Sequence, residues 1–122
     1  MRQRLSELET DKIIFEIRRY RLKSGKRDAF IHFFETVNRP ALRAAGMLVF
    51  GPMRDLEDPD VVHWLRAFPS MEERERIKAA FYDGPVWQKE VEPIVMPMIE
   101  HFEASVAEAT EGFEGFSETA AR

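Results

Sequence analysis

Residues 15–22 read Phe15-Glu16-Ile17-Arg18-Arg19-Tyr20-Arg21-Leu22, and this stretch decides the fold. Successive side chains of a β-strand point to opposite faces, so a strand over residues 13–22 places Ile13, Phe15 and Ile17 together. The opposite face then carries Ile14, Glu16, Arg18, Tyr20 and Leu22. Because large side chains occur on both faces, we expect both faces of this strand to be covered.

An amphipathic helix is predicted after the turn at Ser24-Gly25. Its apolar residues recur at spacings of three and four, which is the period of one helix face. They are Phe30, Phe33, Phe34, Val37, Ala41, Leu42 and Ala45. Pro40 should bend or interrupt the helix because proline lacks the backbone donor, and Gly46 should end it.

The next segments predict two further strands and a second helix. Residues 47–53 form a strand in which Gly51-Pro52 indicates a bulge or an edge position, and the acidic residues 55–60 form a hairpin loop. Residues 61–68 form the third strand. Ser70 and Glu73 then make a capping box for a helix over residues 71–82.

The C-terminal third is less regular. Pro85 is expected in the first turn of a short helix that carries Trp87 and Val91. Residues 98–106 form either a fourth strand or a short helix. The order β-α-β-β-α-β predicts an α+β, ferredoxin-like plait, with an antiparallel sheet and both helices on one of its faces.

The domain organisation follows from these elements. Residues 1–11 are expected to be a flexible lead-in, residues 12–106 the folded domain, and residues 107–122 a mobile acidic tail. Because the second face of the sheet is also apolar, we predict a homodimer whose two sheets pack face to face into a dimeric α+β barrel. Pairing of dimers into a tetramer is left open.

Composition excludes several classes of protein. The chain has 122 residues and no cysteine, so it is one domain without a disulfide, a thiolate nucleophile or a cysteine-ligated metal. A net charge of -4 argues against nucleic-acid binding. No apolar run is long enough to cross a membrane, and a cytoplasmic location is expected. We expect no cofactor.

Four segments together resemble the NIPSNAP family: residues 16–26, the strand at 62–68, the helix opening at 70–76, and the turn Gly84-Pro85-Val86-Trp87. The resemblance covers roughly residues 12–95. It departs from the family pattern at Ser24, where proline is frequent before the glycine, and at Gly51-Pro52, which interrupts the second strand.

The resemblance implies the dimeric α+β barrel superfamily, which also includes cofactor-independent monooxygenases and haem-handling proteins. It implies no known reaction. It does imply a small-molecule cavity between the sheet and the helices of each protomer.

Three residues are candidates for catalysis. His63 lies mid-strand among apolar residues, and histidine is a common general base in enzymes, so it is the candidate base, although a neutral core histidine is the favoured interpretation. Arg18 and Tyr20 share a strand face with Glu16. They either form a structural ion-pair network or clamp a carboxylate or enolate.

Aromatic side chains are candidates for a ligand-binding wall. We expect Trp64, Trp87, Phe33 and Phe81 to line the cavity, with Tyr82 beside them, although core packing explains the same residues. His32 and Glu35 have a spacing that a metal site would use, but a solvent-facing pair is favoured and no metal is predicted.

The sequence therefore predicts a protein that binds a small hydrophobic or aromatic molecule. If it is an enzyme, the chemistry is a cofactor-free oxygenation or isomerisation, with His63 as base and Arg18 or Tyr20 stabilising an enolate. The alternative is a non-enzymatic homodimeric stress or interaction platform, in which Phe113 and Phe116 of the tail dock a partner. Haem binding through His63 or His32 is a third hypothesis.

Overall fold

The central strand of the sheet is β1 (Ile14–Leu22), which pairs antiparallel with β3 (Val61–Phe68) on one side and β4 (Ile99–Glu108) on the other. The edge strand β2 (Leu48–Arg54) pairs with β3, so the order is β2-β3-β1-β4. The computed structural model describes residues 13–114. Within them, the predicted ferredoxin-like α+β plait is confirmed. Of residues 98–106, all but Met98 belong to a strand, and Met98 ends a short 3₁₀ turn.

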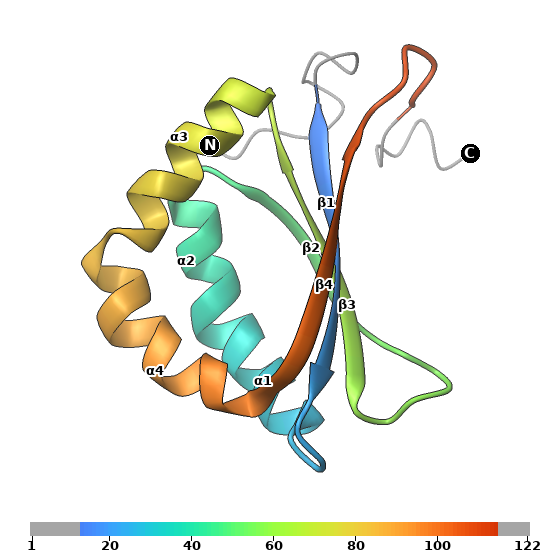
Figure 1. Ribbon diagram of the computed structural model, residues 1–122, viewed down its shortest axis with the longest axis vertical. Coiled ribbons are helices and arrows are strands. Elements are labelled where there is room, and N and C mark those ends of the chain that lie inside the picture. Colours follow the sequence, from blue (N-terminus) through green and yellow to red (C-terminus); the bar gives the residue numbers. More distant parts are fainter. Residues whose placement is uncertain (1–12, 115–122) are drawn as a thin grey trace.

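All helices lie on one face of the sheet (Figure 1). The first helical segment consists of α1 (Arg27–Phe33), a π-helical stretch (Phe34–Asn38) and α2 (Arg39–Ala44). The second consists of α3 (Met71–Tyr82), a π-helical stretch (Val86–Val91), α4 (Glu92–Val95) and a short 3₁₀ turn (Met96–Met98). The space between these two segments and the sheet is where a ligand cavity was expected.

Both π-helical stretches precede a proline. Pro40 lies in the first turn of α2 and Pro93 in the first turn of α4. Proline has no N–H to donate to the preceding turn, so the helix widens locally instead of continuing its regular ladder. The prediction that Pro40 disturbs the first helix is therefore correct, and the disturbance is a π-bulge within one continuous helical path.

The helix α3 begins where the capping box predicts. The hydroxyl of Ser70 accepts a hydrogen bond from the Glu73 backbone N–H at 3.1 Å, and Ser70 has extended backbone angles. An N-cap of this kind satisfies one of the free donors of the first turn. It fixes the start of the helix that carries Arg74, Lys78 and Tyr82.

Strand β2 is irregular at Gly51-Pro52. Its register against β3 shifts between Phe50 and Met53, as predicted for a bulge on an edge strand. Gly51 has φ +114°, and a Cβ placed there would lie 3.0 Å from Cβ of Trp64. The close approach and the backbone angle both require glycine at this position.

The two faces of β1 follow the predicted alternation. Glu16, Arg18, Tyr20 and Leu22 are buried on the helix side, within or beside the main hydrophobic core. On the other face, Ile13 and Phe15 are buried but Ile17 is 50% exposed. The outer face of the sheet is thus covered over one part only.

The C-terminal segment provides that partial cover. Strand β4 continues to Glu108, and the backbone N–H of Ala109 donates to the carbonyl of Ile13 at 2.9 Å. The ring of Phe113 contacts Phe15 edge-on, with ring centroids 5.4 Å apart. The chain therefore stays on the sheet beyond residue 106, where the mobile tail was predicted to begin. Residues 1–12 and 115–122, including Phe116, lie outside the described residues.

Candidate functional site

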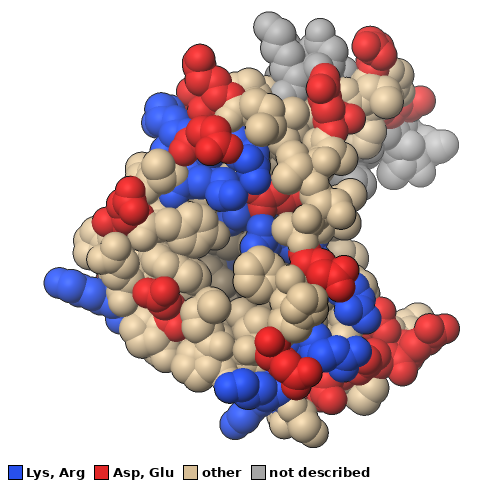
Figure 2. Space-filling model, viewed as in Figure 1, with Lys and Arg blue, Asp and Glu red and all other residues tan. Residues whose placement is uncertain are grey.

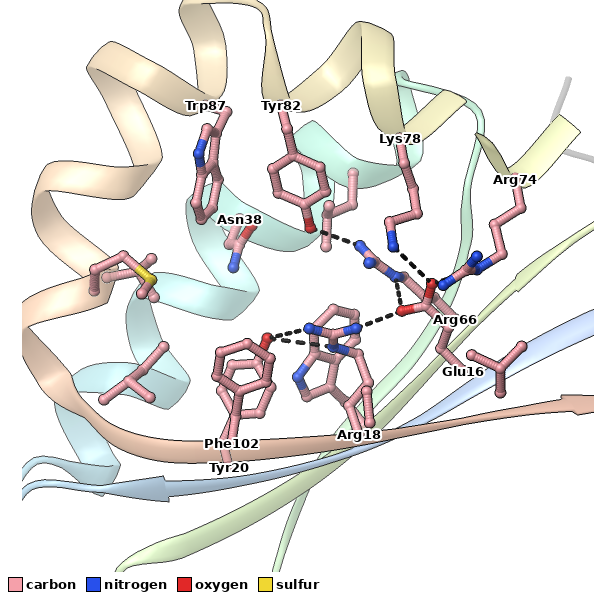
Figure 3. A pocket seen from close by; sticks show the side chains of 17 residues that line it. Glu16, Arg18, Tyr20, Asn38, Arg66, Arg74, Lys78, Tyr82, Trp87 and Phe102 are labelled. Carbon is pink, nitrogen blue, oxygen red and sulfur yellow. Dashed lines mark hydrogen bonds and ion pairs between the residues drawn. The ribbon is translucent and has the colours of Figure 1, made fainter. Parts of the chain in front are cut away.

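A cavity of about 490 Å³ lies between the sheet and the helices. In the space-filling view it appears as a hollow bordered by the basic side chains near α3 (Figure 2). Seventeen residues from β1, β3, β4 and both helical segments line it. The close-up shows that charged side chains occupy one end and aromatic side chains the other (Figure 3).

The charged end is organised around the carboxylate of Glu16, which is 0% exposed. Its Oε1 accepts hydrogen bonds from Arg18 Nη1 and, at 2.8 Å, from Arg66 Nε. Its Oε2 accepts one from Arg74 Nε at 2.8 Å, and Nζ of Lys78 lies 3.5 Å away. A buried carboxylate needs such partners, since its isolated charge would be very costly to bury.

The basic neighbours set the ionisation of this carboxylate. Burial raises the pKa of Glu16, but the charge and hydrogen bond of Arg66, together with the charges of Arg18 and Lys78, outweigh it and lower the pKa to about 2. Burial and the nearby arginines lower the pKa of Lys78, against the opposing effect of Glu16. Four basic side chains and one carboxylate line the cavity, so its charge is predominantly positive.

Arg18 continues the network to Tyr20. The tyrosine oxygen accepts hydrogen bonds from Arg18 Nε at 3.3 Å and from Nη2 at 3.1 Å. The guanidinium also lies 5.2 Å from the ring centroid of Trp64 and 5.3 Å from that of Phe102. Burial raises the pKa of Tyr20, against the effect of Arg18, so its hydroxyl keeps its proton at neutral pH.

A second arginine–tyrosine pair bridges the two layers. Arg66 Nη1 on β3 donates to the hydroxyl of Tyr82 on α3 at 2.9 Å. A guanidinium cannot accept a hydrogen bond, so the hydroxyl protons of Tyr20 and Tyr82 remain available for another acceptor. Figure 3 shows both hydroxyls pointing into the space between the layers.

Two further polar atoms of the lining have no hydrogen-bond partner among the described residues. They are Nε1 of Trp64 and Oδ1 of Asn38, and both are buried. Buried polar groups in folded proteins are almost always paired, so orphaned atoms beside a cavity indicate where a ligand or water would bind. The cavity thus offers donors from Tyr20, Tyr82 and Trp64, and one acceptor from Asn38.

The other end of the cavity is apolar and aromatic. Trp87 follows α3 and packs against Tyr82, with ring centroids 4.9 Å apart. Phe102 on β4 packs against Tyr20, with ring centroids 5.2 Å apart. The remaining apolar lining comes from Leu42, Val95, Met96, Ile99, Ala104 and Val106. Walls of this composition suit a flat apolar group.

The structure brings four of the predicted site residues into the cavity. Arg18, Tyr20, Trp64 and Trp87 line it. Phe81 instead lines a separate apolar groove of about 350 Å³ between α2 and the end of α3. Phe33 packs against the main core and is not in the cavity wall.

His63 is not in the cavity, contrary to expectation. The residues of β3 that face the helices are Val62, Trp64, Arg66 and Phe68, so His63 points to the opposite face of the sheet. Its side chain is 38% exposed, and Nε2 lies 2.7 Å from Oδ1 of Asp55 in the β2–β3 loop. His63 is therefore neither a core histidine nor placed to act on a ligand in this cavity.

Three functional candidates were missed in the sequence: Arg66, Arg74 and Lys78. Tyr82 was expected beside the cavity and lines it. A signal for two of the missed residues exists, because Arg74 and Lys78 recur with Tyr82 every fourth residue and must share one face of α3. Arg66 and Trp64 are two residues apart on β3 and therefore lie on the same face of the strand. Only the register between β1 and β3 places Arg66 opposite Glu16.

Metal binding finds no structural support in residues 13–114, where no group of three or more His, Asp or Glu side chains could hold an ion. His32 and Glu35 are both exposed on the first helical segment. Among the helices described, none is long and apolar enough to span a bilayer.

The family model for NIPSNAP matches residues 15–111, a range that includes every strand and helix described above except Ile14, the first residue of β1. The chain belongs to the NIPSNAP family. No curated protein matches it. The family assignment confirms the resemblance seen in the sequence and, like it, brings no assigned reaction.

Solved structures of NIPSNAP proteins have the same fold. A NIPSNAP-like domain protein from Burkholderia xenovorans is 21% identical with a TM-score of 0.75, over 84% of this chain and 90% of that one. A NIPSNAP family protein of unknown function from Agrobacterium tumefaciens is 22% identical with a TM-score of 0.74, over 91% and 96% of the two chains.

A more distant neighbour, described as a putative antibiotic biosynthesis monooxygenase, comes from Nitrosomonas europaea. It is 14% identical with a TM-score of 0.64, over 81% of this chain and 91% of that one. At these identities the likeness establishes the fold alone.

Proposed function

We propose that this NIPSNAP protein binds a small, flat, largely apolar organic molecule in the cavity between its sheet and its helices. The observation that carries the proposal is the lining itself, which combines an aromatic wall with orphaned polar atoms and converging donors at one end. Ligand sites typically have this composition and a volume of a few hundred Å³.

The geometry supports binding better than it supports proton abstraction. The candidate base, His63, lies on the other face of the sheet, and the cavity's carboxylate, Glu16, has a pKa lowered to about 2 and contacts four basic side chains. A carboxylate so stabilised is a weak base at neutral pH. The oxygenation or isomerisation suggested by the sequence therefore lacks the histidine base on which it depended.

The alternative of a purely structural interaction platform predicts a filled interior. The cavity argues for a small-molecule role instead, because a protein without a ligand gains stability by filling such a space with its own side chains. The same argument accounts for the orphaned atoms of Trp64 and Asn38, which a packed core would have paired or excluded.

Both tryptophans of the chain line the cavity, so tryptophan emission reports on this site directly. We expect the neutral aromatic amide 2-naphthamide to change that emission saturably and to release heat in calorimetry. The variant Ala104→Trp should abolish both signals, because Ala104 lies in the cavity wall on β4.

The matched control is Ala107→Trp, which adds the same bulk on the same strand outside the lining. It should bind 2-naphthamide as the unmodified protein does. Equal binding of 2-naphthamide by the Ala104→Trp variant would overturn the proposal, as would failure of the unmodified protein to bind both 2-naphthamide and its carboxylate analogue 2-naphthoate.

A further inference from the structure

The charges of the cavity identify the class of ligand, on the basis of the binding function proposed above. Arg18, Arg66, Arg74 and Lys78 all contact one internal anion, the carboxylate of Glu16. Within residues 13–114, only Arg74 of these four cations has a second acidic partner, the exposed Glu75 at 2.6 Å. The protein supplies fewer negative charges than the cluster can accommodate.

The hydrogen-bonding groups of the cavity also favour an anion, because most of those left unpaired are donors. The hydroxyls of Tyr20 and Tyr82 each accept from an arginine, which directs their protons elsewhere. Nε1 of Trp64 is a third donor, and it is buried with no partner among the described residues. Three donors beside an excess of positive charge favour an acceptor that carries negative charge.

The positions of these groups agree with one binding mode. Arg18 and Arg66 lie between the charged end and the aromatic end, and the two tyrosine hydroxyls approach from opposite layers (Figure 3). Trp87 and Phe102 lie beyond them, away from Lys78 and Arg74 (Figure 3). A ligand with an acid group at one end and a flat apolar body would satisfy both halves.

We propose that the ligand is an organic acid, bound as its anion, with the acid group near the hydroxyls of Tyr20 and Tyr82 and its apolar body against Trp87 and Phe102. Arg18 and Arg66 supply positive charge, and their side chains are already held in place by Glu16 and by an aromatic ring before a ligand binds. Such pre-ordering lowers the entropic cost of binding.

The test compares two probes of the same shape, 2-naphthoate and its neutral counterpart 2-naphthamide, by calorimetry at pH 7 and low salt. We expect the unmodified protein to bind 2-naphthoate about tenfold tighter or more, as is reasonable for a charge-assisted hydrogen bond in a partly buried site. Lys78→Met removes one cation at the cavity margin and should reduce that ratio several-fold, mainly by weakening 2-naphthoate.

Lys89→Met is the matched control, because Lys89 is exposed, lies outside the lining and carries the same charge. It should leave the ratio unchanged. Tyr82→Phe gives an independent measurement, since it removes one donor and keeps the ring, and it should weaken 2-naphthoate several-fold.

The outcomes separate the two proposals. Equal affinity for the two probes, or a ratio insensitive to both Lys78→Met and Tyr82→Phe, would overturn the acid-ligand proposal and leave the binding function standing. Failure of both probes to bind would overturn the binding function and this inference with it.

Discussion

Arg66 donates from Nε to Oε1 of Glu16 at 2.8 Å, and this bond joins two almost fully buried side chains that are 50 residues apart in the chain. It couples β1 to β3 on the helix side of the sheet. The same carboxylate binds Arg74 of α3, so Glu16 also connects the sheet to the helical layer. Stability and the candidate site therefore depend on the same residue.

Glu16→Gln should reduce the free energy of unfolding at pH 7 by about 3 to 5 kcal/mol, the usual cost of leaving buried charges uncompensated. The folded pKa of Glu16 is about 2, below the ordinary value of 4.5. Its contribution is therefore complete above pH 4.5 and is lost as the pH falls toward 2, a change worth roughly 3 kcal/mol.

The measurement is chemical denaturation of both proteins across pH 7 to 2.5. The stability difference between the unmodified protein and the variant should shrink below pH 4.5. A difference that stays constant over this range would show that the carboxylate's charge does not contribute as described.

The fold could be predicted because its signals are local. Three signals depend only on residues close by in the sequence. They are the alternation in residues 13–22, the capping box at Ser70 and the glycine at position 46. The same is true of Gly51-Pro52, whose bulge needs only a proline without a donor and a glycine that accepts a positive φ. Local rules of this kind can be applied without knowing the tertiary contacts.

The site could be predicted only in part, because its contacts are not local. Arg18 and Tyr20 were found on the strand that holds Glu16. Arg66 and Arg74 contact the same carboxylate, that of Glu16, from 50 and 58 residues away in the chain. Contacts over such distances cannot be inferred from local sequence patterns. The error at His63 has the same cause, since alternation separates His63 from Trp64 but does not say which of them faces the helices.

Gly51→Ala should destabilise the fold by about 2 kcal/mol or more, because the backbone has φ +114° and the new Cβ would lie 3.2 Å from Cα of Trp64. Thermal unfolding measures the effect. Gly112→Ala is the control, since nothing lies within 4 Å of its added Cβ, and it should be close to neutral. Equal melting temperatures for the two variants would contradict the role assigned to Gly51.

Ser70→Ala should cost about 1 kcal/mol, since it removes the hydroxyl that accepts from the Glu73 backbone N–H. The first turn of α3 should fray, and hydrogen exchange should speed up at residues 72–74. Ser24→Ala is a suitable comparison because Ser24 is exposed in the turn before α1. Unchanged exchange in the Ser70 variant would show that the cap does not hold the helix start.

His63→Asn should leave the affinity for 2-naphthamide and 2-naphthoate within about twofold of the unmodified protein, because His63 lies outside the cavity and binds Asp55. Calorimetry with both probes checks this expectation. The pair is exposed to solvent, so we expect only a small loss of stability. A large loss of affinity would restore His63 as a functional residue.

We propose that the protein is a homodimer, because the outer face of the sheet presents Ile17, 50% exposed, beside the partly exposed Leu65. A second copy is the occupant we infer, since an identical sheet face offers a matching apolar surface. Ile17→Glu should then dissociate the dimer in analytical ultracentrifugation. The matched control is Ile94→Glu, which changes an isoleucine that is 51% exposed on the helical layer and should leave the dimer intact. A monomeric unmodified protein, or dissociation by both variants alike, would refute this interface.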